Sequence, residues 1–302
     1  MFKSIVGYNI VEFRNAIAEG DLAKIDACLT YFKKKGKLDE MLCSWQGTFE
    51  IKYSDHYVVG NPIFEAFRNI NDPRYAAAIM LLKAGTDPCY VSWAKNIICY
   101  AINYNSLRLL RLLMWFVDDY EKMLATKIVS TTVGALLADR ERRNPGFTAK
   151  VEAAFKDAQE VKALLAQAKE LDLDKAVPIY ARAAELYAKN AALEHLPEYE
   201  GHEDIRRHYC LEAYAIYQSL DEAYHRLTDL SLKQKKHHLA ITKNLATIFR
   251  YLSPKEANFY EAYAKLLEHD LRPKPEATQA AFFEARESVC AGASLSFEKG
   301  GP

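Results

Sequence analysis

The chain has 302 residues, about twice the length of a typical domain, so its length favours two domains. Apolar residues make up 50 % and charged residues 26 %, with only 12 Gly and 10 Pro, a composition that excludes a collagen-like chain and is not typical of general disorder. Lys and Arg together number 40, as do Asp and Glu, so the formal net charge is zero. This balance gives no electrostatic basis for general binding to nucleic acid or to an anionic membrane surface.

The N-terminal segment and the cysteines indicate a cytoplasmic protein. Glu12 and Arg14 interrupt the apolar run that a secretory signal needs, and no stretch of about 18 uncharged apolar residues predicts a membrane span. The six cysteines form no C-x-x-C pair, which excludes a zinc ribbon and a thioredoxin-like motif. We therefore expect reduced thiols in a cytosol, and the sequence predicts neither a cofactor nor a metal site.

Helical periodicity runs through most of the chain and predicts an all-α fold. In Leu107–Trp115, for example, the leucines share one side of a helix while Arg108 and Arg111 share the other. Strand signals are sparse. The clearest is Phe49–Ser54, whose apolar and polar residues alternate as in one arm of a hairpin.

Three segments of the first 120 residues share a pattern centred on a small residue. Ala16, Ala66 and Ala101 each lie in the first of two short predicted helices. Ala66 and Ala101 are 35 residues apart, whereas Ala16 and Ala66 are 50 apart, so we expect an insertion within residues 33–60. Alanine at these positions lets paired helices pack closely, and Gly85 can adopt the positive φ that ends a helix.

The middle segment resembles an ankyrin repeat. Asn61-Pro-Ile-Phe64 stands where that family has Thr-Pro-Leu-His, and Leu81-Leu-Lys-Ala-Gly-Thr-Asp87 matches the end of the family's second helix. The resemblance implies irregular ankyrin-like repeats that form a helical solenoid over residues 1–140. It also implies that the protein binds another protein through the concave face of the stack.

On this chain the concave face would carry aromatic and Arg side chains, which often anchor interfaces. The residues that we expect to bind the partner are Tyr57, Arg68, Tyr90, Trp93 and Tyr104. The same side chains could instead pack against the following domain. The sequence does not decide between these two interpretations.

The charged run Arg140–Arg143 followed by Asn-Pro-Gly predicts a turn between two domains. We expect a helical bundle over residues 146–291, with helices at 148–171, 173–195, 203–218, 220–249, 254–269 and 275–291. Residues 176–186 weakly resemble the second helix of a tetratricopeptide repeat.

Residues 292–302 are small and polar and are expected to form a flexible tail. An ankyrin-like chain with such a C-terminal tail resembles the bacterial effectors that a type IV secretion system exports. The resemblance implies an alternative location in the cytosol of a host cell.

The motifs that could carry chemistry are few, and no catalytic residue is predicted. Glu222 and His225 share a helix face, but a di-iron bundle needs two such pairs, so we expect them to lie on solvated helix surface. His237 and His238 diverge by about 100° on a helix and are expected to lie in a solvated basic turn. Lys33–Lys37 is expected to be a solvated helix end.

Two functions from different classes follow. The first is a protein-binding module or adaptor, and the second is an enzyme with an unrecognised active site in the C-terminal bundle or at the domain junction. The second rests on the histidines that gather within 31 residues, which are His195, His202, His208 and His225. A polar pocket joining two of them to a carboxylate would favour the enzyme.

Overall fold

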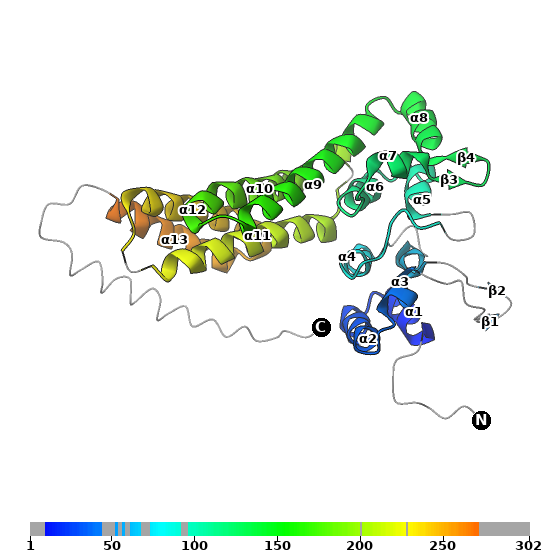
Figure 1. Cartoon of the computed structure of the whole chain (residues 1–302), viewed down its shortest axis with the longest axis horizontal. Coiled ribbons are helices and arrows are strands. Elements are labelled where there is room, and N and C mark those ends of the chain that lie inside the picture. Colours follow the sequence, from blue (N-terminus) through cyan, green and yellow to red (C-terminus); the bar gives the residue numbers. More distant parts are fainter. Residues whose placement is uncertain are drawn as a thin grey trace, which may run out of the picture. The chain divides into compact units, whose positions relative to one another are not determined.

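The computed structural model describes residues 10–43, 52–53, 56–57, 61–67, 73–91, 96–199, 201–227 and 229–271 (Figure 1). Most of these residues are helical and very few lie in strands, which confirms the predicted all-α class. They fall into two compact units. Unit 1 comprises residues up to Gln159 together with Glu194–Ile205, and unit 2 comprises Glu160–Leu193 together with residues from Arg206 onward. Within the described ranges, no helix has an apolar stretch long enough to cross a bilayer.

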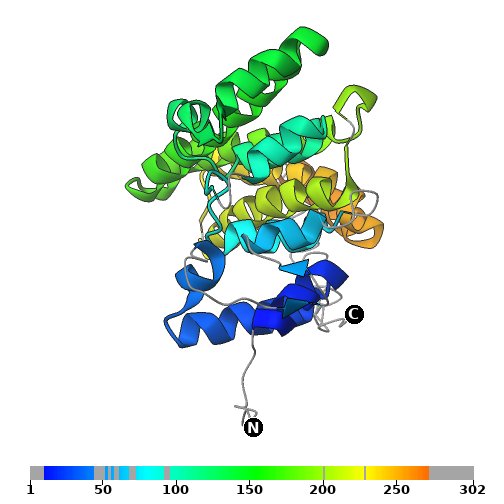
Figure 2. The same cartoon turned by 90° about the vertical axis from the view of Figure 1, so that its right-hand side faces the viewer.

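Unit 1 begins with a tight pair of helices, α1 (Ile10–Glu19) and α2 (Leu22–Lys34), which pack together (Figure 2). Gly20 turns the chain between them with φ +76°, a conformation that favours glycine. The Asp21 side chain accepts a hydrogen bond from the Lys24 N–H and so caps α2.

The expected insertion holds a helix and a hairpin. Helix α3 (Leu38–Cys43) follows α2, and strand β1 (Lys52–Tyr53) pairs antiparallel with β2 (His56–Tyr57). The described part of the predicted strand at 49–54 is thus confirmed as one arm of a hairpin. The lysines of the predicted helix end at 33–37 are exposed, as expected.

Two further helix pairs follow. The 3-10 helix η1 (Pro62–Phe67) precedes α4 (Tyr75–Lys83), and α5 (Ile97–Asn103) precedes α6 (Leu107–Met114). The amide oxygens of Asn61 and Asn96 cap the first helix of each pair by accepting hydrogen bonds from Ile63 and Cys99. Both asparagines are buried and stand five residues before the alanine of their pair.

The three alanines occupy equivalent positions in their helix pairs. Each is at most 1 % exposed. The carbonyl oxygen of each accepts a hydrogen bond from the backbone N–H of the residue that precedes the second helix. These bonds run from Asp21 to Ala16 at 2.9 Å, from Arg74 to Ala66 at 2.7 Å and from Ser106 to Ala101 at 2.8 Å.

Neighbouring pairs are joined through their first helices. A buried ion pair of 2.9 Å links Arg14 of α1 to Glu65 of η1. The hydroxyl of Tyr100 on α5 donates to the carbonyl oxygen of Phe67 in η1 at 3.1 Å. The contacts therefore proceed in chain order from α1 to η1 to α5, and α2 packs on α4 beside them.

The remainder of unit 1 contains a second hairpin that the sequence pattern did not predict. Helix α7 (Tyr120–Ala125) leads into β3 (Lys127–Ile128) and β4 (Thr131–Thr132), which pair antiparallel and precede α8 (Val133–Arg143). The Arg140 guanidinium donates to the Ile102 carbonyl oxygen at 2.9 Å and so joins α8 to α5.

The predicted turn after Arg143 is present. Gly146 adopts φ +85°, and the Glu141 carboxylate accepts hydrogen bonds from the N–H groups of Gly146 and Thr148. These bonds lower the pKa of Glu141. The turn ends α8 and starts the long helix α9 (Phe147–Lys169).

Arg111 of α6 departs from the predicted pattern. The periodicity places it on the polar side of the helix, yet the residue is 1 % exposed. Its guanidinium forms a 2.7 Å ion pair with Glu194, and its Cζ lies 4.4 Å from the ring centroid of Tyr199, at the end of the short 3-10 helix η2 (Pro197–Tyr199). Residues far along the chain therefore cover the expected polar face.

Unit 2 is built from long helices. The end of α9 is followed by α10 (Leu173–Leu193), α11 (Glu203–His225), α12 (Leu232–Leu252) and α13 (Pro254–Asp270), which lie alongside one another in Figure 1. Tyr217 of α11 accepts a hydrogen bond from Asn244 of α12 at 3.0 Å and is almost fully buried. The predicted helix at 275–291 and the tail at 292–302 lie outside the described residues.

One predicted boundary in unit 2 is wrong. The sequence pattern favoured a break near 219 and a continuous helix over 220–249, whereas α11 continues to His225 and the new helix begins at Leu232. Ser231 and Gln234 form a capping box that starts α12, which is the physical reason for the later break.

Candidate functional site

The predicted partner-binding residues are described in part. Tyr104 follows α5 and is 57 % exposed, and Tyr90 is half-buried after the turn at Asp87. The backbone of Tyr57 lies in β2, but its side chain is outside the described part of the chain, as are Arg68 and Trp93. Their role at an interface stays a prediction.

The exposed ring of Tyr104 rests on a firmly held neighbour. Its centroid lies 4.5 Å from that of Tyr100, which in turn contacts the rings of Phe64 and Phe67 at 6.1 and 6.2 Å. The hydrogen bond from Tyr100 to the Phe67 carbonyl oxygen fixes this ring further. Tyr104 thus presents a large aromatic surface whose position is set by the packing beneath it.

A hollow in unit 1 is lined by both acidic and aromatic side chains. It has a volume of about 610 Å³, and Asp118, Asp119, Glu121 and Glu152 contribute to its walls. The Asp119 carboxylate is engaged in capping α7, and Lys156 lies 3.9 Å from Glu152. Asp119 and Glu152 therefore have structural partners within unit 1.

The four clustered histidines have separate environments. His195 is exposed. The His202 ring contacts Tyr75 at 4.5 Å, and His208 is buried 3.7 Å from Glu212. His225 approaches both a carboxylate and another histidine.

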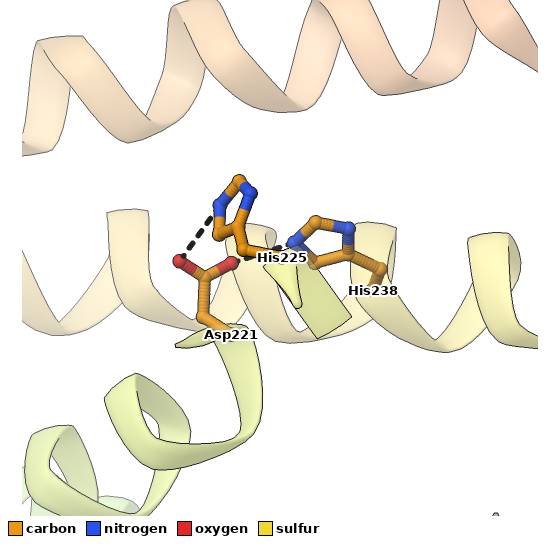
Figure 3. A group of neighbouring side chains, drawn as sticks. All are labelled: Asp221, His225 and His238. Atoms are coloured by element: carbon orange, nitrogen blue, oxygen red, sulfur yellow. Dashed lines mark hydrogen bonds and ion pairs between the residues drawn. The ribbon is translucent and has the colours of Figure 1, made fainter. Parts of the chain in front are cut away.

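That histidine belongs to a cluster of three residues, Asp221, His225 and His238, which we call the Asp-His-His cluster (Figure 3). Asp221 and His225 are four residues apart, so they share one face of the last turns of α11. His238 lies in the second turn of α12. The capping box at Ser231 starts α12 soon after α11 ends and so brings His238 beside Asp221.

The ligating atoms of the cluster converge. Asp221 Oδ1 lies 2.7 Å from His238 Nε2, and Asp221 Oδ2 lies 3.4 Å from His225 Nε2. Taken together, one ligating atom from each residue lies within 4.8 Å of those of the other two. Asp221 and His238 are buried, whereas the His225 side chain is 35 % exposed.

Aromatic side chains complete the surroundings. The Tyr224 ring stacks on His238 with centroids 5.4 Å apart, and Tyr263 of α13 stacks on His225 at 5.7 Å. The Tyr263 hydroxyl also lies 3.4 Å from His225 Nε2. Two rings therefore hold the imidazoles in place from the α11 and α13 sides.

The carboxylate of the cluster is ionised at neutral pH. Burial acts to raise the pKa of Asp221, but hydrogen bonds from His225 and His238 outweigh it and lower the pKa to about 2. The arrangement thus combines one anionic oxygen donor with two imidazole nitrogens.

The structure corrects one expectation about this region and confirms another. His238 is a buried residue of α12 and not part of a solvated basic turn. Glu222 and His225 are both exposed on α11, as expected, although His225 also lies 3.4 Å from the Asp221 carboxylate. The signal that could have located the cluster is the Ser231-x-x-Gln234 capping box, which divides the expected helix. Comparison of the chain with known protein families, curated proteins and solved structures gives no match.

Proposed function

We propose that the protein is a protein-binding adaptor that holds its partner on an ankyrin-like surface of unit 1. The observation that carries this proposal is a backbone hydrogen bond that recurs in the three helix pairs. In each pair the residue before the second helix donates its N–H to the carbonyl oxygen of Ala16, Ala66 or Ala101. A repeated helix pair, with a buried alanine whose carbonyl oxygen accepts from the residue before the second helix, is the kind of unit from which binding solenoids are built.

The contacts between successive pairs support this assignment. The first helices contact one another in chain order through Arg14 and Glu65 and then through Tyr100 and Phe67. In an ankyrin-like stack, the first helices and the hairpin tips form the concave face. We therefore assign partner binding to the five predicted residues, Tyr57, Arg68, Tyr90, Trp93 and Tyr104.

Tyr104 is the anchor that we expect to contribute most among the described members of this face. Its ring is more than half exposed and is held by Tyr100, so little conformational entropy is lost when a partner covers it. Tyrosine at such a position supplies apolar area and a hydroxyl for hydrogen bonding.

The test is quantitative affinity capture with the whole chain from bacterial and from eukaryotic lysates. We expect a protein partner whose recovery falls about tenfold with Tyr104→Ala, equivalent to about 1.4 kcal/mol of binding free energy. The matched control is Tyr251→Ala, which removes a tyrosine that is 43 % exposed on α12 of unit 2.

The comparison of lysates also tests the resemblance to exported effectors. A partner captured only from eukaryotic cells supports action in a host, and one captured from bacterial cells supports an adaptor of the source cell. Equal recovery with Tyr104→Ala and Tyr251→Ala, with both variants unfolding at the wild-type midpoint, would contradict the assigned face.

A further inference from the structure

We propose that Asp221, His225 and His238 bind a divalent transition-metal ion, with zinc as the ion that suits this ligand set best. Two imidazoles and one carboxylate supply the nitrogen and oxygen donors that zinc takes in proteins. The site is in unit 2 and is independent of the partner-binding face proposed for unit 1.

The spacing of the three ligating groups suits a zinc ion. Two ligands bound tetrahedrally to zinc at bond lengths of 2.0–2.2 Å are about 3.3–3.6 Å apart. The Asp221–His225 separation of 3.4 Å already matches this spacing, and the Asp221–His238 separation is 2.7 Å. Because all three ligating atoms lie within 4.8 Å of one another, small side-chain rotations are enough to bring them around one ion.

The Asp221 carboxylate lacks a cationic side chain beside it in the described part of the chain. It is buried, and its two oxygens face the Nε2 atoms of His238 and His225 at 2.7 and 3.4 Å. A buried charge is costly unless it is paired. No Lys or Arg forms an ion pair with Asp221 among the bridges of the described residues, so the histidines and a bound cation are what can balance it.

The cluster is open to solvent on one side and leaves a coordination position free. His225 is 35 % exposed, which gives an ion a route from solvent to the buried Asp221 and His238. Three protein ligands leave a fourth coordination position for water, as in zinc sites that keep an open position. The Tyr263 hydroxyl, 3.4 Å from His225 Nε2, lies close enough to donate a hydrogen bond to such a water.

The experiment is a titration of the full chain, freed of metal by a chelator, with Zn²⁺ by calorimetry and with Co²⁺ by visible absorption. We expect one equivalent of either ion to bind. The Co²⁺ complex should show d–d bands without a thiolate charge-transfer band, which separates this site from the free cysteines Cys28, Cys89, Cys99 and Cys210.

The variant that decides the proposal is His225→Gln, because this residue is partly exposed and its replacement leaves the buried pair of Asp221 and His238 intact. We expect its Zn²⁺ affinity to fall at least about 100-fold. His269→Gln is the matched control, since it changes an exposed histidine of α13 in the same unit, and it should bind as the wild type does.

Thermal unfolding separates loss of the site from loss of the fold. Zn²⁺ should raise the unfolding midpoint of the wild type and of His269→Gln but not that of His225→Gln, whose metal-free midpoint should stay close to the wild-type value. If the wild type binds neither ion, or if His225→Gln and His269→Gln bind alike, the cluster is a hydrogen-bonded structural element and the proposal is wrong.

Discussion

Replacement of Arg111 by alanine is expected to lower the free energy of unfolding of unit 1 by about 3–5 kcal/mol. Arg111 and Glu194 form a 2.7 Å ion pair whose side chains are 1 % and 0 % exposed. Burial raises the pKa of Glu194 against the opposing attraction of Arg111. Without the guanidinium, the buried carboxylate loses its ion-pair partner, and the contact with the Tyr199 ring is also lost.

The measurement is urea unfolding followed by tryptophan fluorescence. Trp45, Trp93 and Trp115 all precede residue 160, so their emission reports on unit 1. Arg142→Ala is the control, because this arginine is 78 % exposed and its bridge to Asp139 is worth about 0–1 kcal/mol. Equal destabilisation by the two variants would contradict the role given to the buried pair.

A double replacement tests the mechanism of this loss. Arg111→Met combined with Glu194→Leu removes both charges and keeps apolar volume. We expect it to be more stable than Arg111→Ala, because the cost of the single variant comes from the unpaired carboxylate. A double variant less stable than Arg111→Ala would show instead that the charges themselves stabilise unit 1.

The second large effect is expected from Ala101→Leu, which should destabilise unit 1 by about 1–3 kcal/mol. Ala101 is 0 % exposed in α5, which packs against α6 and α8, so a larger side chain must displace neighbouring helices. Ala23→Leu is the matched control, since Ala23 lies exposed on α2, and it should change stability by no more than about 0.5 kcal/mol.

The same fluorescence-detected unfolding measures both alanine variants. If Ala101→Leu is as stable as Ala23→Leu, the small side chain is not required for close packing of the helix pair. In that case packing would not explain why Ala16, Ala66 and Ala101 occupy equivalent positions.

The helix pairs of unit 1 could be predicted because their signals are local. A small residue in the first helix, a glycine or a capping residue at the turn and a leucine-rich second helix all lie within about 30 residues. The hairpin of β1 and β2 was likewise visible as an alternating pattern. The hairpin of β3 and β4 was not, because two-residue strands carry no periodicity and its turn uses Val129 at φ +53° instead of glycine.

The interactions that join distant segments could not be predicted. The periodicity of α6 predicts that Arg111 lies on the exposed, polar side of the helix. No local signal indicates that Glu194, 83 residues later, pairs with it. The Asp-His-His cluster was missed for a different reason. On the expected continuous helix, Asp221 and His238 would be about 25 Å apart, whereas the break before Ser231 places them on adjacent helices at 2.7 Å.

The most direct test of the helix-pair architecture is amide hydrogen exchange, resolved by NMR, at Asp21, Arg74 and Ser106. In each pair this N–H donates to the buried alanine, so we predict that all three amides are protected, as expected for bonds inside folded helix pairs. Exchange of any one of them at the rate of an unfolded peptide, while the adjoining second helix stays protected, would contradict the equivalence of the three pairs.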